Sequence, residues 1–169
     1  MRYLARYAAS EASLRRVLEN RIQRTLLYKA QNPADEENLR VLRIKIDRIV
    51  EKHKKIGVLN DANYAEMKVK SLRRQGRSGR VIAQKLYAKG IAKSLIDSTL
   101  QDMRGEDSLE DSELKAARIL AKKKKMGPFR KGASDDRLRR KEFSALARAG
   151  FSSSIARRVL ETEPPEEWE

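Results

Sequence analysis

The chain has 169 residues and carries 39 Lys and Arg residues against 24 Asp and Glu residues, a formal net charge of +15. Its apolar runs are only a few residues long, which argues against a membrane-spanning helix, and the lack of cysteine excludes a disulfide framework. No secretory leader pattern opens the sequence, so we expect a cytoplasmic protein without membrane contact. Because 40% of the residues are hydrophobic, a buried core is feasible, and the excess of positive charge predicts a polyanionic partner.

The chain lacks most residue types on which catalysis depends. Without cysteine it has no thiolate nucleophile and no thiolate zinc site. The single histidine, His53, lies in a lysine-rich run that is typical of a solvated helix end, and one histidine cannot form an H-E-x-x-H zinc site. Neither glycine-rich phosphate-binding motif is present. We therefore predict a protein that is not an enzyme and that has no catalytic residues, no metal site and no cofactor.

Apolar residues recur at helical spacing along almost the whole chain, beginning with expected helices over 3–7, 10–22 and 39–54. The clearest stripe comprises Leu39, Leu42, Ile46, Ile49 and Val50. Shorter stripes follow, and they comprise Ala65, Val69 and Leu72, then Ile82 and Leu86, then Ile96 and Leu100. No stretch alternates as a strand does. The fold class is therefore predicted to be all-α, with eight or nine short helices.

Helix ends and a repeat define the expected organisation. Asp61 and Ser152 have the side chains of N-caps, and Gly90 and Gly150 are suited to the left-handed position that ends a helix. Residues 86–100 align with residues 146–160 at a constant offset of 60.

The repeat predicts three tandem three-helix units in an elongated, curved arrangement. The expected units are 1–56 with an expanded turn at 24–37, 57–105, and 106–163 with a long loop at 127–136, followed by an acidic tail at 164–169. The alternative is a single three-helix domain with accidental internal similarity.

Residues 57–91 carry a more specific pattern. They contain the sequence GVLNDANYA, then the basic segment SLRRQGRSGR, and then a helix that ends in Lys89-Gly90-Ile91. This order resembles the RecX family, and the opening Tyr3–Arg6 and the stretch from Phe143 to Phe151 resemble that family's first and last units. Gly79 departs from the pattern, since proline is common there, and so does the expanded turn at 24–37.

The resemblance implies a regulator of the RecA recombinase that acts as a monomer. Such a protein would bind the groove of the RecA–DNA filament and inhibit ATP hydrolysis, strand exchange and filament growth. It would thereby modulate recombination, DNA repair and the SOS response. The implied partners are the RecA filament and single- or double-stranded DNA, bound without sequence preference, and the family needs no cofactor.

Positive charge is spread along the chain. Residues 1–60, 61–105 and 106–160 carry net charges of +7, +6 and +7. Three clusters are candidate filament or DNA contacts, since arginine and lysine bind phosphates. They comprise Arg73, Arg74, Arg77 and Arg80; Lys122, Lys123, Lys124 and Lys125; and Arg130, Lys131, Arg137, Arg139, Arg140 and Lys141. Phe129, beside the third cluster, is either a stacking residue or, as we favour, a loop anchor.

Two further classes of function remain open from the sequence. A helical DNA-binding protein without sequence preference and without a RecA partner would show the same charge. The helix after Gly90 has few long polar side chains for base edges, so sequence-specific reading is not expected. A basic nuclease or a ribosome-associated protein is disfavoured by the residue inventory.

Overall fold

The computed structural model describes residues 8–27, 34–130, 132–133 and 135–161. The expected helix at 3–7, Lys131 and the tail at 164–169 lie outside them. Every regular element in the described residues is helical, so the all-α prediction is confirmed. The elements are α2 (Glu11–Leu27), α3 (Ala34–Lys55), α4 (Asp61–Arg74), α5 (Gly79–Tyr87), α6 (Lys93–Asp102), α7 (Leu109–Lys124), the 3-10 turn η1 (Gly127–Phe129), α8 (Asp136–Arg148) and α9 (Ser153–Glu161).

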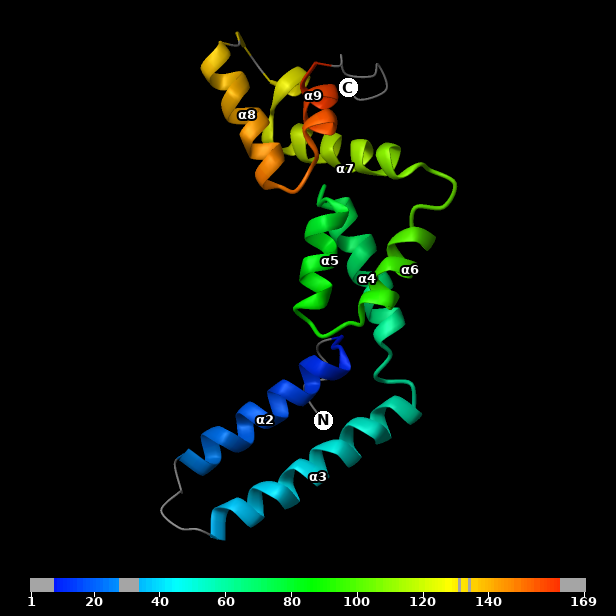
Figure 1. Ribbon diagram of the computed structural model, residues 1–169, viewed down its shortest axis with the longest axis vertical. Helices are drawn as coiled ribbons and strands as arrows, with labels where there is room; N and C mark the ends of the chain where they lie inside the picture. Colours follow the sequence, from blue (N-terminus) through cyan, green and yellow to red (C-terminus); the bar gives the residue numbers. More distant parts are fainter. Residues whose placement is uncertain (1–7, 28–33, 131, 134, 162–169) are drawn as a thin grey trace.

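The helices form three groups that follow one another along the long axis of the molecule (Figure 1). The first group is α2 with α3, the middle group is α4 to α6, and the last group is α7 to α9. Each group has its own cluster of buried hydrophobic side chains. The molecule is elongated, and one side is concave, with α8, α5 and α2 bordering the hollow in succession.

The helix boundaries follow from local capping. Asn60, not Asp61, caps α4, because its side chain accepts a hydrogen bond of 3.0 Å from the amide of Asn63. The expectation for Asp61 was wrong by one residue, since Asp61 is already helical. Ser152 caps α9 as predicted, accepting from the amide of Ile155. Gly90 and Gly150 adopt φ angles of +79° and +92°, which confirms their left-handed role.

The predicted apolar stripes form the cores. Ile82, Leu86 and Leu146 are at most 1% exposed, as the i, i+4 spacing predicts. Tyr64 is 5% exposed and belongs to the core of the middle group. Helices α2 and α3, with 17 and 22 residues, are longer than the short helices expected from the sequence.

A joint of hydrogen bonds connects the first group to the middle group. The buried Ser10 hydroxyl donates to the carbonyl oxygen of Lys89, and the amide of Glu11 donates to Asp61 Oδ1 at 2.9 Å. Gly90 lies so close to Ala12 that a Cβ atom at residue 90 would overlap the alanine methyl group. We call these six residues, Ser10, Glu11, Ala12, Asp61, Lys89 and Gly90, the first joint. The start of α2 is thereby fixed against the turn between α5 and α6.

The middle and last groups meet in the same way. The buried Ser78 hydroxyl donates to the carbonyl oxygen of Ala149 at 2.8 Å, and the amide of Gly79 donates to Glu113 Oε1 at 2.9 Å. A Cβ atom at Gly150 would overlap the Ser78 hydroxyl. We call these five residues the second joint. In each joint the start of one helix, α2 or α5, contacts the glycine turn of the following group, which sets the curvature of the row α2, α5, α8.

Candidate functional site

The first predicted basic cluster lies at the end of α4 and the start of α5, beside the second joint. Arg74, Arg77 and Arg80 are exposed. Gly76 makes the turn between them at a φ of +72°, and its Cα packs so close to α7 that a Cβ atom would lie 2.6 Å from the amide nitrogen of Leu120. The three exposed guanidinium groups are therefore carried by a turn that the neighbouring group holds in place.

Arg73 differs from the other members of that cluster. Its side chain is 21% exposed, and its Nη1 donates to Glu113 Oε1 at 2.8 Å and to the carbonyl oxygen of Arg77. The same Glu113 oxygen accepts the amide of Gly79, so one carboxylate joins the end of α4, the start of α5 and α7. Arg73 therefore stabilises the second joint.

The second predicted cluster, Lys122 to Lys125, ends α7, and all four side chains are exposed. Lys125 has a left-handed conformation with a φ of 53°, and its amide donates to the carbonyl of Lys122. Four lysines at a helix C-terminus complement the negative end of the helix dipole. The run also presents positive charge to any anion that approaches this end of the helix.

The third predicted cluster is divided by burial. Arg130 is 14% exposed at its side chain and forms a two-pronged contact with the buried Glu142, from Nε to Oε1 at 3.0 Å and from Nη2 to Oε2 at 2.5 Å. The hydrogen bond to Glu142 raises the pKa of Arg130, against the opposing effect of desolvation. Glu142 also accepts the amide of Gly127 at 3.1 Å. This pair fixes η1 and the loop after α7 to α8.

The remaining members of the third cluster lie on the first half of α8. Arg137, Arg139, Arg140 and Lys141 are exposed, while Lys131 lies outside the described residues. Phe129 is half-buried and packs against the core of the last group, which agrees with its interpretation as a loop anchor. Asp135 caps α8 by accepting the amide of Leu138.

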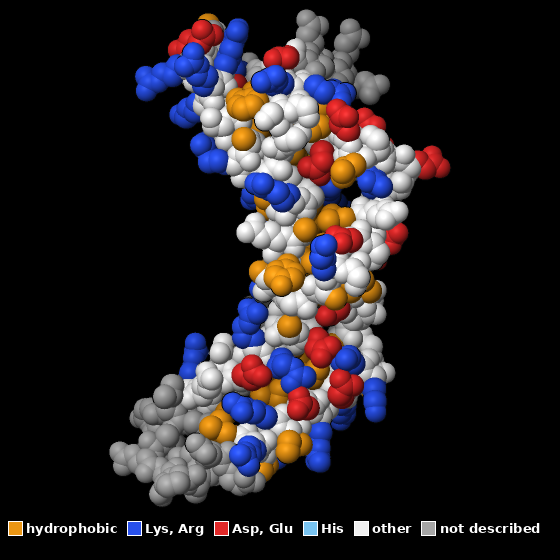
Figure 2. Space-filling model, viewed as in Figure 1, with side chains coloured by type: hydrophobic (Ala, Val, Ile, Leu, Met, Phe, Trp, Pro, Cys, Tyr) orange, Lys and Arg blue, Asp and Glu red, His pale blue; other side chains and the backbone are white. Residues whose placement is uncertain are grey.

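The concave side brings together parts of all three groups. In Figure 2, Lys and Arg side chains border the hollow at its upper end, its middle and its lower end, and most acidic side chains in this view lie toward the opposite edge. Helix α5, in the middle of this row, contains no acidic residue. Exposed residues on these helices that the sequence did not single out include Gln84, Lys85, Tyr87 and Arg148. The helical spacing of polar residues opposite Ile82 and Leu86 was the available signal for those on α5.

A cavity of about 720 Å³ lies between the middle and last groups. Its lining carries both signs of charge, with Arg73, Arg80 and Arg104 on one hand and Asp97, Glu110 and Glu113 on the other. The described residues contain no group of side chains suited to a metal ion. None of their helices is both long enough and apolar enough to cross a membrane.

Comparison with known proteins decides the family. A family model described as RecX, second three-helix domain, matches residues 60–100, which contain α4, α5 and most of α6. A curated protein of Myxococcus xanthus, named Regulatory protein RecX, is 40% identical over 165 residues, which are 97% of this chain and 83% of that protein. The chain belongs to the RecX family of regulatory proteins. The resemblance carried by residues 57–91 is therefore confirmed.

Other members of the RecX family match over shorter stretches. The Agrobacterium fabrum protein is 42% identical over 105 residues, 62% of this chain and 53% of its own length. The Chlorobium phaeobacteroides protein is 35% identical over 118 residues, 69% of this chain and 70% of its own length. Both carry the name Regulatory protein RecX. No solved structure matches the chain.

Proposed function

We propose that this protein binds along the groove of the RecA–DNA filament and inhibits ATP hydrolysis, strand exchange and filament growth. Through this inhibition it modulates recombination, DNA repair and the SOS response. It acts by binding alone and requires no cofactor. The proposal rests on membership of the RecX family and on the shape and charge of the concave side.

The observation that carries the proposal is the row of helices α2, α5 and α8, held in a curve by two equivalent joints. A curved row of repeated helices can contact several neighbouring subunits of a helical polymer at once. Its distributed positive charge suits a partner that is itself long and negatively charged.

The proposed contact residues are the cations of the three clusters that remain exposed. They are Arg74, Arg77 and Arg80, Lys122 to Lys125, and Arg137, Arg139, Arg140 and Lys141. Arg73 and Arg130 are committed to Glu113 and Glu142 and act by holding the surface together. Charge attracts the protein to the filament in a salt-sensitive way, whereas the shaped surface supplies specificity.

The test is a titration of this protein against the DNA-dependent ATPase of preformed RecA filaments. We expect inhibition at protein concentrations that leave bare DNA of the same length mostly unbound. Inhibition that begins only when the DNA is saturated would instead support a DNA-binding protein without a RecA partner.

A charge-reversal pair tests the surface. Arg77→Glu with Arg80→Glu is expected to weaken inhibition at least tenfold, because it replaces two exposed cations around the start of α5 by anions. Lys68→Glu with Lys70→Glu, on α4 of the same group, changes the net charge equally and is the matched control. An equal loss of inhibition in both double variants would show that only net charge matters, and it would contradict the proposed contact surface.

A further inference from the structure

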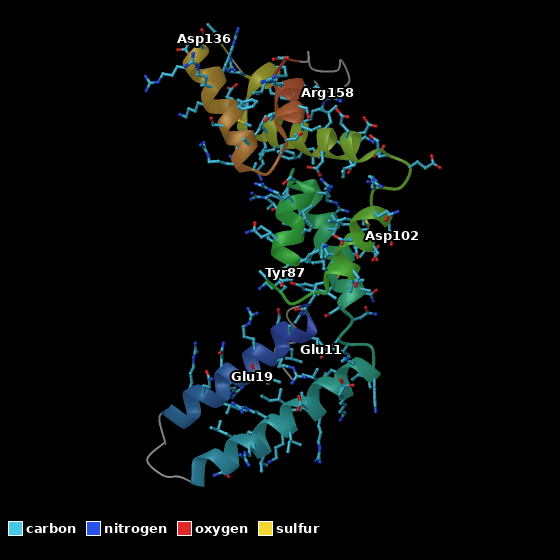
Figure 3. The ribbon with its side chains drawn as sticks, in the orientation of Figure 1. Glu11, Glu19, Tyr87, Asp102, Asp136 and Arg158 are labelled. Carbon is cyan, nitrogen blue, oxygen red and sulfur yellow. The ribbon has the colours of Figure 1, made fainter. Side chains whose placement is uncertain are left out.

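Tyr87, the last residue of α5, has a side chain that belongs to none of the hydrophobic cores of the described residues. It is 71% exposed, whereas its neighbour Leu86 is 1% exposed and lies in the core. Within the described part of the chain, the Tyr87 side chain makes no hydrogen bond and no ring contact, and beyond the helix only its backbone carbonyl is bonded, to the amide of Gly90. Figure 3 shows it at the end of α5, beside the first joint. Since isolated exposed apolar residues are common, its surroundings must decide what the ring does.

On α5 itself those surroundings are polar and positive. Arg80, Gln84 and Tyr87 follow one another at i, i+4 and i+7, so they form one exposed stripe along α5, opposite the side that buries Ile82. The stripe spans about 10 Å between the Cα atoms of its ends. The helix carries no carboxylate that would repel a phosphate.

Those three side chains match the three chemical parts of a nucleotide chain. A guanidinium binds a phosphate, an amide can bind a base edge, and an aromatic ring stacks on a base face. We propose that the α5 stripe binds single-stranded DNA, with the ring of Tyr87 stacked on a base and Arg80 on a phosphate. Binding of single-stranded DNA specifies the form of DNA in the proposed function. The inference rests on the DNA contact of that function and does not depend on the contact with RecA.

Single-stranded DNA fits the stripe better than a duplex or a protein. In a duplex the base faces are covered by neighbouring bases, so the ring would have no stacking partner. A protein-binding hot spot usually has a packed apolar centre. The other large exposed hydrophobic side chains among the described residues, such as Val41, Ile44 and Leu109, lie outside α5, so Tyr87 has no apolar neighbour of that kind on its helix.

The experiment measures binding of a fluorescent oligothymidylate in the absence of RecA. Tyr87→Ala is expected to weaken binding about 5- to 150-fold without changing the slope of affinity against salt, since the ring carries no charge. Tyr87→Phe is expected to bind as the unaltered protein does. Met67→Ala removes a 52% exposed side chain from α4 of the same group, and it is the control expected to have no effect.

Two further ligands isolate the base. On an abasic strand, and on a duplex of the same length, Tyr87→Ala is expected to match the unaltered protein. In a Trp168→Phe background, Tyr87→Trp places the only tryptophan on the stripe, and its fluorescence is expected to be quenched by oligothymidylate but not by the abasic strand.

Three results would overturn the inference. They are unchanged oligothymidylate binding by Tyr87→Ala, an equal loss on the abasic strand, or no binding of oligothymidylate by the unaltered protein. If Tyr87→Ala binds DNA normally but fails to inhibit the RecA ATPase, the ring contacts RecA, and the inference fails while the proposed function stands. Conversely, selective loss on oligothymidylate supports the inference even if the RecA ATPase is unaffected by the unaltered protein.

Discussion

The hydroxyl of Ser78 donates a hydrogen bond of 2.8 Å to the carbonyl oxygen of Ala149, 71 residues further along the chain. Ser10 makes the same contact with the carbonyl oxygen of Lys89. In both cases the serine also caps its own helix, accepting an amide three residues later. One side chain thus caps the start of a helix and joins two helix groups, so we expect the curvature of the concave side to depend on these two hydroxyl groups.

Ser78→Ala is the first prediction. Loss of the cap costs about 1 kcal/mol, and the unpaired carbonyl of Ala149 adds about 1–2 kcal/mol to the loss of stability. Ser108→Ala is the matched control, because Ser108 caps α7 by accepting the amide of Asp111 and, within the described residues, its side chain forms no hydrogen bond with another helix group. Urea unfolding should show a larger loss for Ser78→Ala. Equal losses would mean that the contact with Ala149 contributes nothing to stability.

The second prediction concerns the glycine on the other side of that joint. In Gly150→Ala the new residue must adopt a φ of +92°, and its methyl group would overlap the Ser78 hydroxyl. In Gly105→Ala the new residue must adopt a φ of +62°, but its methyl group would have no atom within 4 Å. The control is expected to cost about 1–2 kcal/mol from backbone strain alone. Gly150→Ala should cost about 1–3 kcal/mol more, because the added methyl group forces the two groups apart.

Small-angle scattering checks the geometry of the same pair of variants. Gly150→Ala is expected to change the radius of gyration, and Gly105→Ala is expected to leave it unchanged. A Gly150→Ala protein with unaltered stability and shape would show that the second joint does not fix the curvature.

The buried ion pair of the last group gives the third prediction. Glu142→Ala leaves Arg130 without its carboxylate and is expected to lower the melting temperature by roughly 6–20 °C. Asp107→Ala breaks the exposed pair with Lys115 and is expected to lower it by less than about 4 °C. Similar shifts would show that the Arg130 contact behaves as a surface pair.

The pH dependence of the Arg130–Glu142 ion pair follows from the pKa of Arg130. Because the pKa of Arg130 is raised above its ordinary value, its contribution to stability is present below that ordinary value and is lost only at still higher pH. The destabilisation of Glu142→Ala measured between pH 6 and 9 should therefore not vary through titration of Arg130.

The sequence predicted the helices and their buried faces because both depend on neighbours three or four residues away. Ile82 and Leu86 are an example, and both lie in the core. It could not separate Arg73 from Arg77, since the difference is made by Glu113, forty residues from Arg73 and on another helix. The two joints were not predicted either, because Ser10 and Ser78 bond to residues 79 and 71 positions away in the sequence. The offset of 60 residues between Gly90 and Gly150 did identify the glycine turn that takes part in each joint. Tyr87 was missed because a stripe of three polar or aromatic residues resembles any solvated helix face.

The last prediction measures how much of DNA binding is electrostatic at the exposed arginines. The affinity for single-stranded DNA falls as salt rises. Arg77→Gln with Arg80→Gln should make the plot of log affinity against log salt less steep by about 1.4, since each phosphate contact contributes about 0.7 to the steepness. Lys68→Gln with Lys70→Gln removes equal charge from α4, where Lys70 is paired with Glu66 and Lys68 lies 5.7 Å from the Tyr64 ring centroid. This control pair should leave the slope nearly unchanged, because residues that do not contact phosphates release no counterions. If both pairs lower the slope equally, the protein binds DNA through its overall charge, and the concave side has no privileged part in the contact.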